Sequence, residues 1–183
     1  VDDGTTRTDI TGTAPTGAID NKWTGGSLNG VFVLNNGVDK PMFWGGDTGV
    51  NLATLTGWDA THLCAALRPF KNFLIALDVT KGATRYPHMV KWSAAANPGA
   101  VPSDWDETDP TIDAGEQDLA GADPLVDALQ LGDALIRYKQ RSCWAMTFIG
   151  APYIFRFQLL PGEYGMLARG CAVDTPLGHV VLS

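Results

Sequence analysis

The sequence predicts an all-β protein in which antiparallel four-stranded sheets form the blades of a complete or partial β-propeller. Short apolar runs recur in pairs, and the same six-residue step separates the two runs in three of the pairs. Runs that carry a tryptophan follow three of these expected strands. Short strands in units of about 40 to 60 residues are typical of propeller blades. The six-residue steps lead from Leu67 to Phe73, from Leu129 to Leu135, and from Val173 to His179.

Apolar content and turn chemistry justify each expected strand. The pair Asn36-Gly37 supplies the positive backbone angles of a tight hairpin, and Lys81-Gly82 is a weaker version of the same signal. Residues 73–77 are apolar throughout, as expected of an innermost strand that is packed on both faces. Residues 153–157 alternate with the period of two that marks a strand. In chain order the expected strands are 31–34, 42–44, 64–67, 73–77, 89–92, 126–129, 134–138, 143–146, 153–157, 170–173 and 179–182.

One of these segments leaves an alternative open. Asp123 suits the N-cap of a helix, Pro124 suits the first helical position, and the apolar residues that follow stand near helical spacing. A short helix over residues 123–129 is therefore the alternative to a strand.

Three tryptophans mark the expected repeat. Trp44, Trp92 and Trp144 follow one another at intervals of 48 and 52 residues. Each stands in an expected strand, where a large aromatic side chain contributes most by packing in the core or between blades. We predict that these three residues are repeated core aromatics, and the alternative is a set of stacking platforms for sugars or bases.

The chain divides into two parts of different composition. Residues 1–25 are rich in Thr, Gly and Asp, so they cannot bury enough apolar surface to offset the entropy lost on ordering. We expect them to form an extended arm or linker, and residues 26–183 to form the propeller-like domain. Because the chain begins with Val1 and ends in an unfinished apolar run, we expect it to be a fragment of a longer protein.

Composition excludes several classes of protein. An apolar fraction of 45% with 18% charged residues is typical of a globular domain. A net charge of -7 argues against a broad basic face that grips DNA and against attraction to an anionic membrane. No apolar run approaches the roughly 20 residues of a membrane helix. The three cysteines form no CxxC pair, so neither a disulfide framework nor a zinc site is indicated.

Acidic residues gather in one segment. Between Trp92 and Ile136 there are ten acidic residues and neither Lys nor Arg. Such a segment must be solvated or paired, because burying an unpaired charge costs several kcal/mol. We predict that it faces solvent, either at a DNA channel or at an interface with another protein. The candidate residues are Asp104, Asp106, Glu107, Asp109, Asp113, Glu116 and Asp118.

Two sharper interpretations of this segment are a calcium loop and a pair of glycosidase carboxylates. Counted from Asp104, the EF-hand positions that require Gly and Glu hold Asp109 and Gly115, so that motif fails. Carboxylates at a spacing suited to glycoside hydrolysis arise by accident in any loop this acidic. We therefore predict a solvated, self-repelling loop with no metal and no catalytic residue.

Other motifs for catalysis or cofactor binding are missing from the sequence. The three histidines do not stand at metal-ligand spacing, and there is no G-x-S-x-G, phosphate-binding or dinucleotide-binding pattern. Trp58-Asp59 and Trp105-Asp106 lack the upstream Gly-His of a WD repeat, and we expect both in loops. We predict a protein that is not an enzyme and that uses no cofactor.

The most distinctive stretches of the sequence are 86–93, 104–106, 131–138, 142–148 and 165–171. They resemble virion structural proteins of tailed phages, most closely the propeller-bearing tail hub or nozzle proteins of short-tailed phages, including the packaged-DNA stabilisation type. The resemblance covers roughly residues 62–183 and includes no catalytic fingerprint.

The resemblance implies a structural protein of the phage tail. Such subunits form homo-oligomeric rings, usually hexamers, beneath the portal and adaptor, with tail fibres as further neighbours. DNA passes through the channel without specific binding, and no membrane is involved. A net charge of -7 fits a wall that must release DNA. The alternative is a propeller module of a tail fibre or tip that binds a host glycan, and a glycan-cleaving enzyme is more distant. A glycan-binding module should expose Trp or Tyr on a concave face, whereas a hub should bury its tryptophans.

Overall fold

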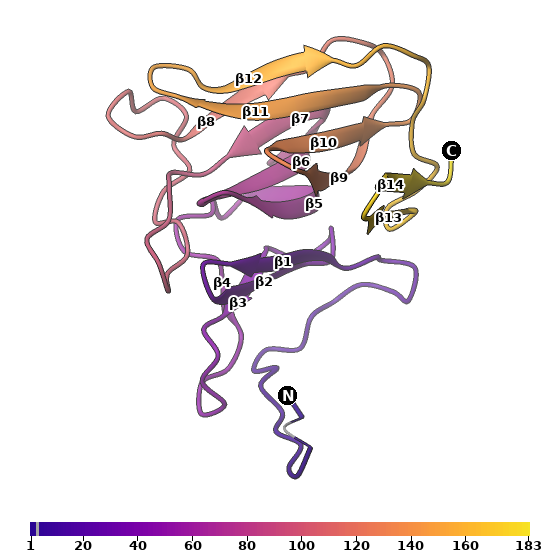
Figure 1. Ribbon diagram of the computed structural model, residues 1–183. Coiled ribbons are helices and arrows are strands. Elements are labelled where there is room, and N and C mark those ends of the chain that lie inside the picture. Colours follow the sequence, from indigo (N-terminus) through magenta and orange to yellow (C-terminus); the bar gives the residue numbers. More distant parts are fainter. Residues whose placement is uncertain (3) are drawn as a thin grey trace.

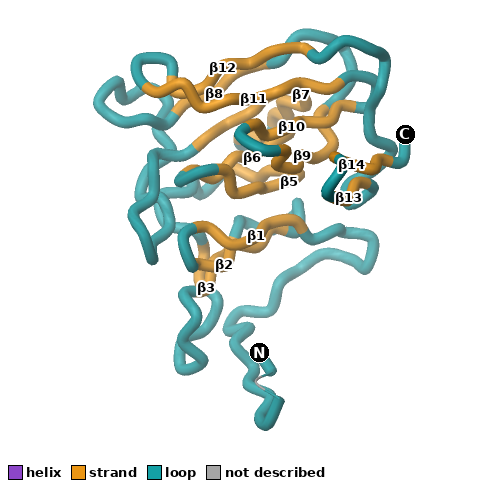
Figure 2. The backbone as a smooth tube through the Cα atoms, viewed as in Figure 1, coloured by secondary structure: helices purple, strands orange, loops and turns teal. Residues whose placement is uncertain are grey.

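The computed structural model describes residues 1–2 and 4–183, and in these residues it confirms the all-β class. Four antiparallel sheets follow one another along the chain, and each is built from strands consecutive in sequence (Figures 1 and 2). The first sheet contains β1 (Thr24–Leu28), β2 (Val31–Asn35), β3 (Met42–Trp44) and β4 (Ala53–Thr54). The second contains β5 (His62–Phe70), β6 (Phe73–Lys81), β7 (Thr84–Trp92) and β8 (Gly115–Asp118).

The third sheet contains β9 (Leu125–Leu131), β10 (Ala134–Lys139), β11 (Cys143–Gly150) and β12 (Ile154–Leu159). The fourth is a hairpin of β13 (Ala172–Thr175) and β14 (Gly178–Val181). Three sheets therefore have four strands and one has two. The segment for which a helix was the alternative forms β9, because its apolar side chains pack between neighbouring sheets. The described residues contain no helix that is long and apolar enough to cross a membrane.

The N-terminal segment extends below the first sheet in Figure 1. The expected boundary at residue 25 falls inside β1, which already begins at Thr24. Several hydrogen bonds attach the segment to loops of the first sheet. The backbone N–H of Thr16 donates to Asp39 Oδ2 at 2.7 Å, and the N–H of Leu52 donates to the carbonyl of Ile10 at 2.7 Å.

The second sheet is packed on both faces. Alternate side chains of β6 point in opposite directions, so Leu74 and Ala76 join the apolar cluster shared with the first sheet. Ile75 and Leu77 join the cluster shared with the third sheet. The continuous apolar run of residues 73–77 is explained by this two-sided burial. Its strand is the second of its sheet, between β5 and β7, rather than the innermost one.

The first strands of successive sheets contact one another, β1 with β5, β5 with β9, and β9 with β13. A polar network links these strands, and we call it the axial network. The Arg68 guanidinium on β5 donates to both carboxylate oxygens of Asp127 on β9, at 2.8 and 2.7 Å. Arg68 also donates to the carbonyl of Gly25 on β1 at 3.3 Å, and the N–H of Gly170, just before β13, donates to Asp127 at 3.2 Å. The sheets are therefore held together along the line where their first strands meet.

Candidate functional site

The seven candidate residues of the acidic segment, Asp104 to Asp118, lie in β8 and in the connection from β7 to β8. Since β8 pairs only with β7, this segment lies at the edge of the second sheet opposite the first strand β5. Their carboxylates are solvated or paired, and they fall into three groups: glutamates paired with lysines, aspartates that shape the loop, and exposed aspartates.

Two glutamates of the segment are paired with lysines. Lys81 Nζ lies 2.8 Å from Glu107 Oε1 and 2.6 Å from Glu116 Oε2. Lys91 Nζ also bonds to Glu107 and lies 3.5 Å from Glu116. We call these four residues the lysine–glutamate cluster. Burial alone would raise the pKa of Glu107, but the hydrogen bonds from both lysines outweigh it and lower the pKa to about 2.

The aspartates shape the loop itself. Asp106 Oδ1 accepts hydrogen bonds from the backbone N–H and the hydroxyl of Thr108, at 2.9 and 2.7 Å. Asp109 holds Thr111 in the same way, and Asp104 accepts the N–H of Asp106 at 2.8 Å. These are local turns that asparagine and aspartate side chains favour. The remaining two candidate residues, Asp113 and Asp118, are exposed.

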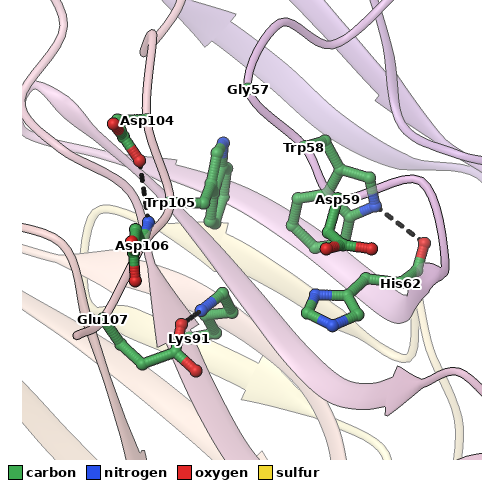
Figure 3. Close-up of a pocket in the computed structure, with 9 residues that line it drawn as sticks. All are labelled: Gly57, Trp58, Asp59, His62, Lys91, Asp104, Trp105, Asp106 and Glu107. Carbon is green, nitrogen blue, oxygen red and sulfur yellow. Dashed lines mark hydrogen bonds and ion pairs between the residues drawn. The ribbon is translucent and has the colours of Figure 1, made fainter. Parts of the chain in front are cut away.

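A cleft of about 390 Å³ opens where this loop meets the connection between the first two sheets (Figure 3). Its walls are two copies of one short motif, Trp-Asp-x-Thr, at Trp58–Thr61 and Trp105–Thr108. In both copies the aspartate accepts the N–H and the hydroxyl of the threonine two residues later. The lining residues are Gly57, Trp58, Asp59, His62, Lys91, Asp104, Trp105, Asp106 and Glu107.

The two tryptophans of the cleft pack against each other. The ring centroids of Trp58 and Trp105 lie 4.7 Å apart with an interplanar angle of 86°, and both side chains are buried. The Trp58 indole N–H donates to the carbonyl of His62 at 2.8 Å. Gly57 has a φ of +71°, and a Cβ there would lie 2.2 Å from the carbonyl oxygen of Ser103, so only glycine allows the two loops to approach.

The cleft is lined largely by charged and polar side chains. Its rim carries the carboxylates of Asp59, Asp104 and Asp106. Burial lowers the pKa of His62, so its imidazole is neutral at neutral pH, and Lys91 is held by Glu107. No group of three or more metal-ligating side chains occurs within residues 1–2 and 4–183. The arrangement suits a polar or cationic group, and its tryptophan rings cover each other rather than the opening.

The three repeated tryptophans all lie on third strands, β3, β7 and β11. Trp92, on the second sheet, is 8% exposed and packs in the cluster between the second and third sheets. Trp144, on the third sheet, is half-buried and packs against the same cluster. A Cβ at Gly115 would lie 2.5 Å from the Trp92 ring, so β8 passes directly over it. Trp44 is also half-buried, but it pairs with the exposed Phe32 on the outer face of the first sheet.

Sequence reasoning missed the cleft and the lysine partners. The signal for the cleft was present, because the two Trp-Asp-x-Thr copies stand 47 residues apart, close to the interval of the strand tryptophans. Lys81 and Lys91 lie outside the acidic segment and reach it only through the pairing of β7 with β6 and β8. Comparison with known proteins adds no identity. No protein-family model and no curated protein matches the chain.

Proposed function

We propose that this chain is a propeller-type structural subunit of a tailed-phage virion, a non-enzymatic component of the tail hub or nozzle. The observation that carries the proposal is the serial stacking of antiparallel sheets, whose first strands converge on the axial network of Gly25, Arg68, Asp127 and Gly170. Consecutive four-stranded sheets that radiate from a common axis are the plan of a β-propeller. The two-stranded hairpin then stands in the position of the next blade.

The burial of tryptophan favours this role over the glycan-binding alternative. Trp58, Trp92 and Trp105 are buried, and Trp44 and Trp144 are half-buried. Trp23 alone among the six is classed as exposed. A glycan site that works by stacking needs aromatic faces on a concave surface. The cleft between the Trp-Asp loops offers none, so the groove beside Trp23 and Phe32 is the place left for the glycan-binding alternative.

The acidic segment has a specific place in this proposal. It lies at the outer edge of the second sheet, away from the strands that meet at the axis, so we assign it to a junction with another tail protein such as the portal, the adaptor or a fibre. DNA would pass through a ring of subunits, usually six, without specific binding. The net charge of -7 keeps such a wall repulsive to DNA.

The direct test is to locate the chain in intact phage particles. A short epitope inserted beside Leu177, which is fully exposed at the tip of the hairpin, leaves the packed faces untouched. Electron microscopy with gold-labelled antibody should place the label on the tail just beneath the capsid. Label on the capsid shell, or particles that carry none of the chain, would overturn the proposal. A matched particle without the epitope controls for unspecific labelling.

A further inference from the structure

Two sheet faces of the molecule are uncovered and apolar. On the hairpin, Val173 and Val180 form a cross-strand pair that is 56% and 61% exposed. On the first sheet, Trp23 and Phe32 are 49% and 46% exposed, and they line a groove of about 230 Å³ together with Leu34 and, at one side, Arg68. Contiguous exposed apolar patches commonly mark interaction surfaces.

Every covered face in the chain obeys one packing rule. We call the face of a sheet toward the preceding sheet its rear face, and the face toward the following sheet its forward face. Each interface joins a forward face to a rear face. One apolar cluster includes Val33 and Leu74, a second includes Ile75 and Met146, and a third includes Ile136 and Ala172. Under this rule, the forward face of the hairpin and the rear face of the first sheet have no partner sheet among the described residues.

The tryptophan repeat shows what the rear face of the first sheet lacks. Trp44 and Trp144 both lie on third strands and both belong to rear faces, whereas Trp92 belongs to the forward face of the second sheet. Trp144 packs against the cluster that the third sheet shares with the second sheet. Trp44 has no sheet of the described chain against it, and its indole N–H bonds instead to the carbonyls of Asp47 and Val50, at 2.9 and 3.1 Å. The first sheet therefore presents the same kind of surface that the third sheet buries.

We propose that these two faces dock on each other between two copies of this chain, the hairpin of one copy on the first sheet of the next. Such a contact continues the forward-to-rear packing already present within one chain. It is a head-to-tail contact, which closes into a ring when the rotation allows and otherwise extends into a filament. The inference deepens the proposed function by naming the partner surface, and it rests on that function only for closure into a ring.

Sedimentation velocity over a range of protein concentrations tests the docking. The wild-type chain should associate, and Phe32→Glu and Val180→Lys should each weaken association at least about ten-fold, because each places a charge in an apolar contact. Leu177→Lys, at the fully exposed hairpin tip outside the docking face, is the matched control and should associate like the wild type. Circular dichroism and thermal melting establish that each variant is folded.

Mixing the two variants tests the head-to-tail geometry. Phe32→Glu retains an intact hairpin and Val180→Lys retains an intact first sheet, so an equimolar mixture should form a one-to-one dimer that does not grow further. A wild-type chain that stays monomeric at every concentration, or a variant that still dimerises alone, overturns the docking. That result leaves the tail labelling untouched, whereas label missing from tails with association intact overturns the proposed function instead.

Discussion

Two buried cations on β10 differ sharply in their surroundings. Lys139 is fully buried at the rim of the third sheet, and its ammonium donates to the carbonyls of Ala120 and Gly121 at 3.0 and 3.2 Å. It also lies 3.3 Å from Asp123 Oδ1. Arg137 is equally buried, yet none of its three guanidinium nitrogens has a hydrogen-bond partner among the described residues. The Phe157 ring lies against the guanidinium, with its centroid 4.5 Å from Cζ.

The difference shows that a buried charge finds hydrogen-bond partners at the rim of a sheet but not in the interface between two sheets. At the rim, the loop before β9 brings carbonyls and a carboxylate over the sheet. In the interface between the second and third sheets the neighbours are apolar or aromatic, and the indole N–H of Trp144 is also buried there without a partner. Burial lowers the pKa of Arg137 to about 9, so the guanidinium is still charged at neutral pH. Contact with an aromatic ring offsets only part of the desolvation cost.

The largest expected effect comes from removing a buried charge whose partners are all in place. Asp127 is fully buried and accepts two bonds from Arg68 and one each from the N–H groups of Ala128 and Gly170. Asp127→Ala should lower the free energy of unfolding by about 3 to 5 kcal/mol, because Arg68 loses its counter-ion and two backbone donors lose their acceptor. Urea denaturation measures the change.

The control for this substitution is an aspartate in a surface pair. Asp133 bonds to Lys71 at 2.7 Å, but its side chain is 96% exposed. Asp133→Ala should leave the free energy of unfolding nearly unchanged, since solvent screens exposed ion pairs. Equal losses for the two variants would contradict the view that the axial network holds the sheets together.

A second prediction compares the two cations of β10 directly. Lys139→Met should destabilise the protein by about 1.5 to 3 kcal/mol, because it removes the charged donor from two carbonyls and from Asp123. Arg137→Met should leave stability unchanged or raise it by about 1 kcal/mol, because it replaces an unpartnered charge by an apolar side chain of similar length. Chemical denaturation of both variants under the same conditions gives the comparison. A loss at Arg137 as large as that at Lys139 would show that Arg137 has a partner in solution.

Much of the fold could be predicted because its signals are local. Alternation, apolar runs and turn residues locate eleven of the fourteen strands in the described residues and miss β1, β4 and β8, of which β8 lies in the segment expected to be a loop. The recurring tryptophans identify the third strand of each four-stranded sheet. Residues 73–77 are packed on both faces, as their apolar run predicts. The prediction that they form the innermost strand is wrong, because the position of a strand in its sheet depends on which strands pair. The helix alternative at 123–129 failed for a related reason, since capping signals at Asp123 and Pro124 are outweighed by sheet packing on both sides.

The site could be predicted only in part, because it depends on contacts between distant segments. The requirement that the acidic segment be solvated or paired follows from electrostatics alone, and the structure fulfils it. Which glutamates are paired depends on Lys81 and Lys91, which only strand pairing brings to the segment. The face on which Trp44 lies depends on strand register, so its uncovered position could not be read from its spacing.

The smallest expected effect concerns the lysine–glutamate cluster at the β8 edge of the second sheet, where solvent partly screens the ion pairs. The lysines of the lysine–glutamate cluster lower the pKa of Glu107 from 4.5 to about 2. A carboxyl group whose pKa is lower in the folded than in the unfolded protein stabilises the fold above the unfolded pKa. This stabilisation is lost as the pH falls from about 4.5 toward 2. Because the pair is partly screened by solvent, its size is on the order of 1 kcal/mol.

Glu107→Gln removes this titration and so isolates its contribution. The difference in unfolding free energy between wild type and variant should be largest near neutral pH and should shrink as the pH falls below about 4.5. Glu163→Gln, at an exposed glutamate with no salt bridge among the described residues, is the matched control for the change of side chain. A Glu107→Gln difference that is flat between pH 7 and pH 2.5 would mean that the lysines do not hold this carboxylate in solution. Glu107 at the β8 edge would then lack effective charge partners, as Arg137 does, rather than having them, as Lys139 does.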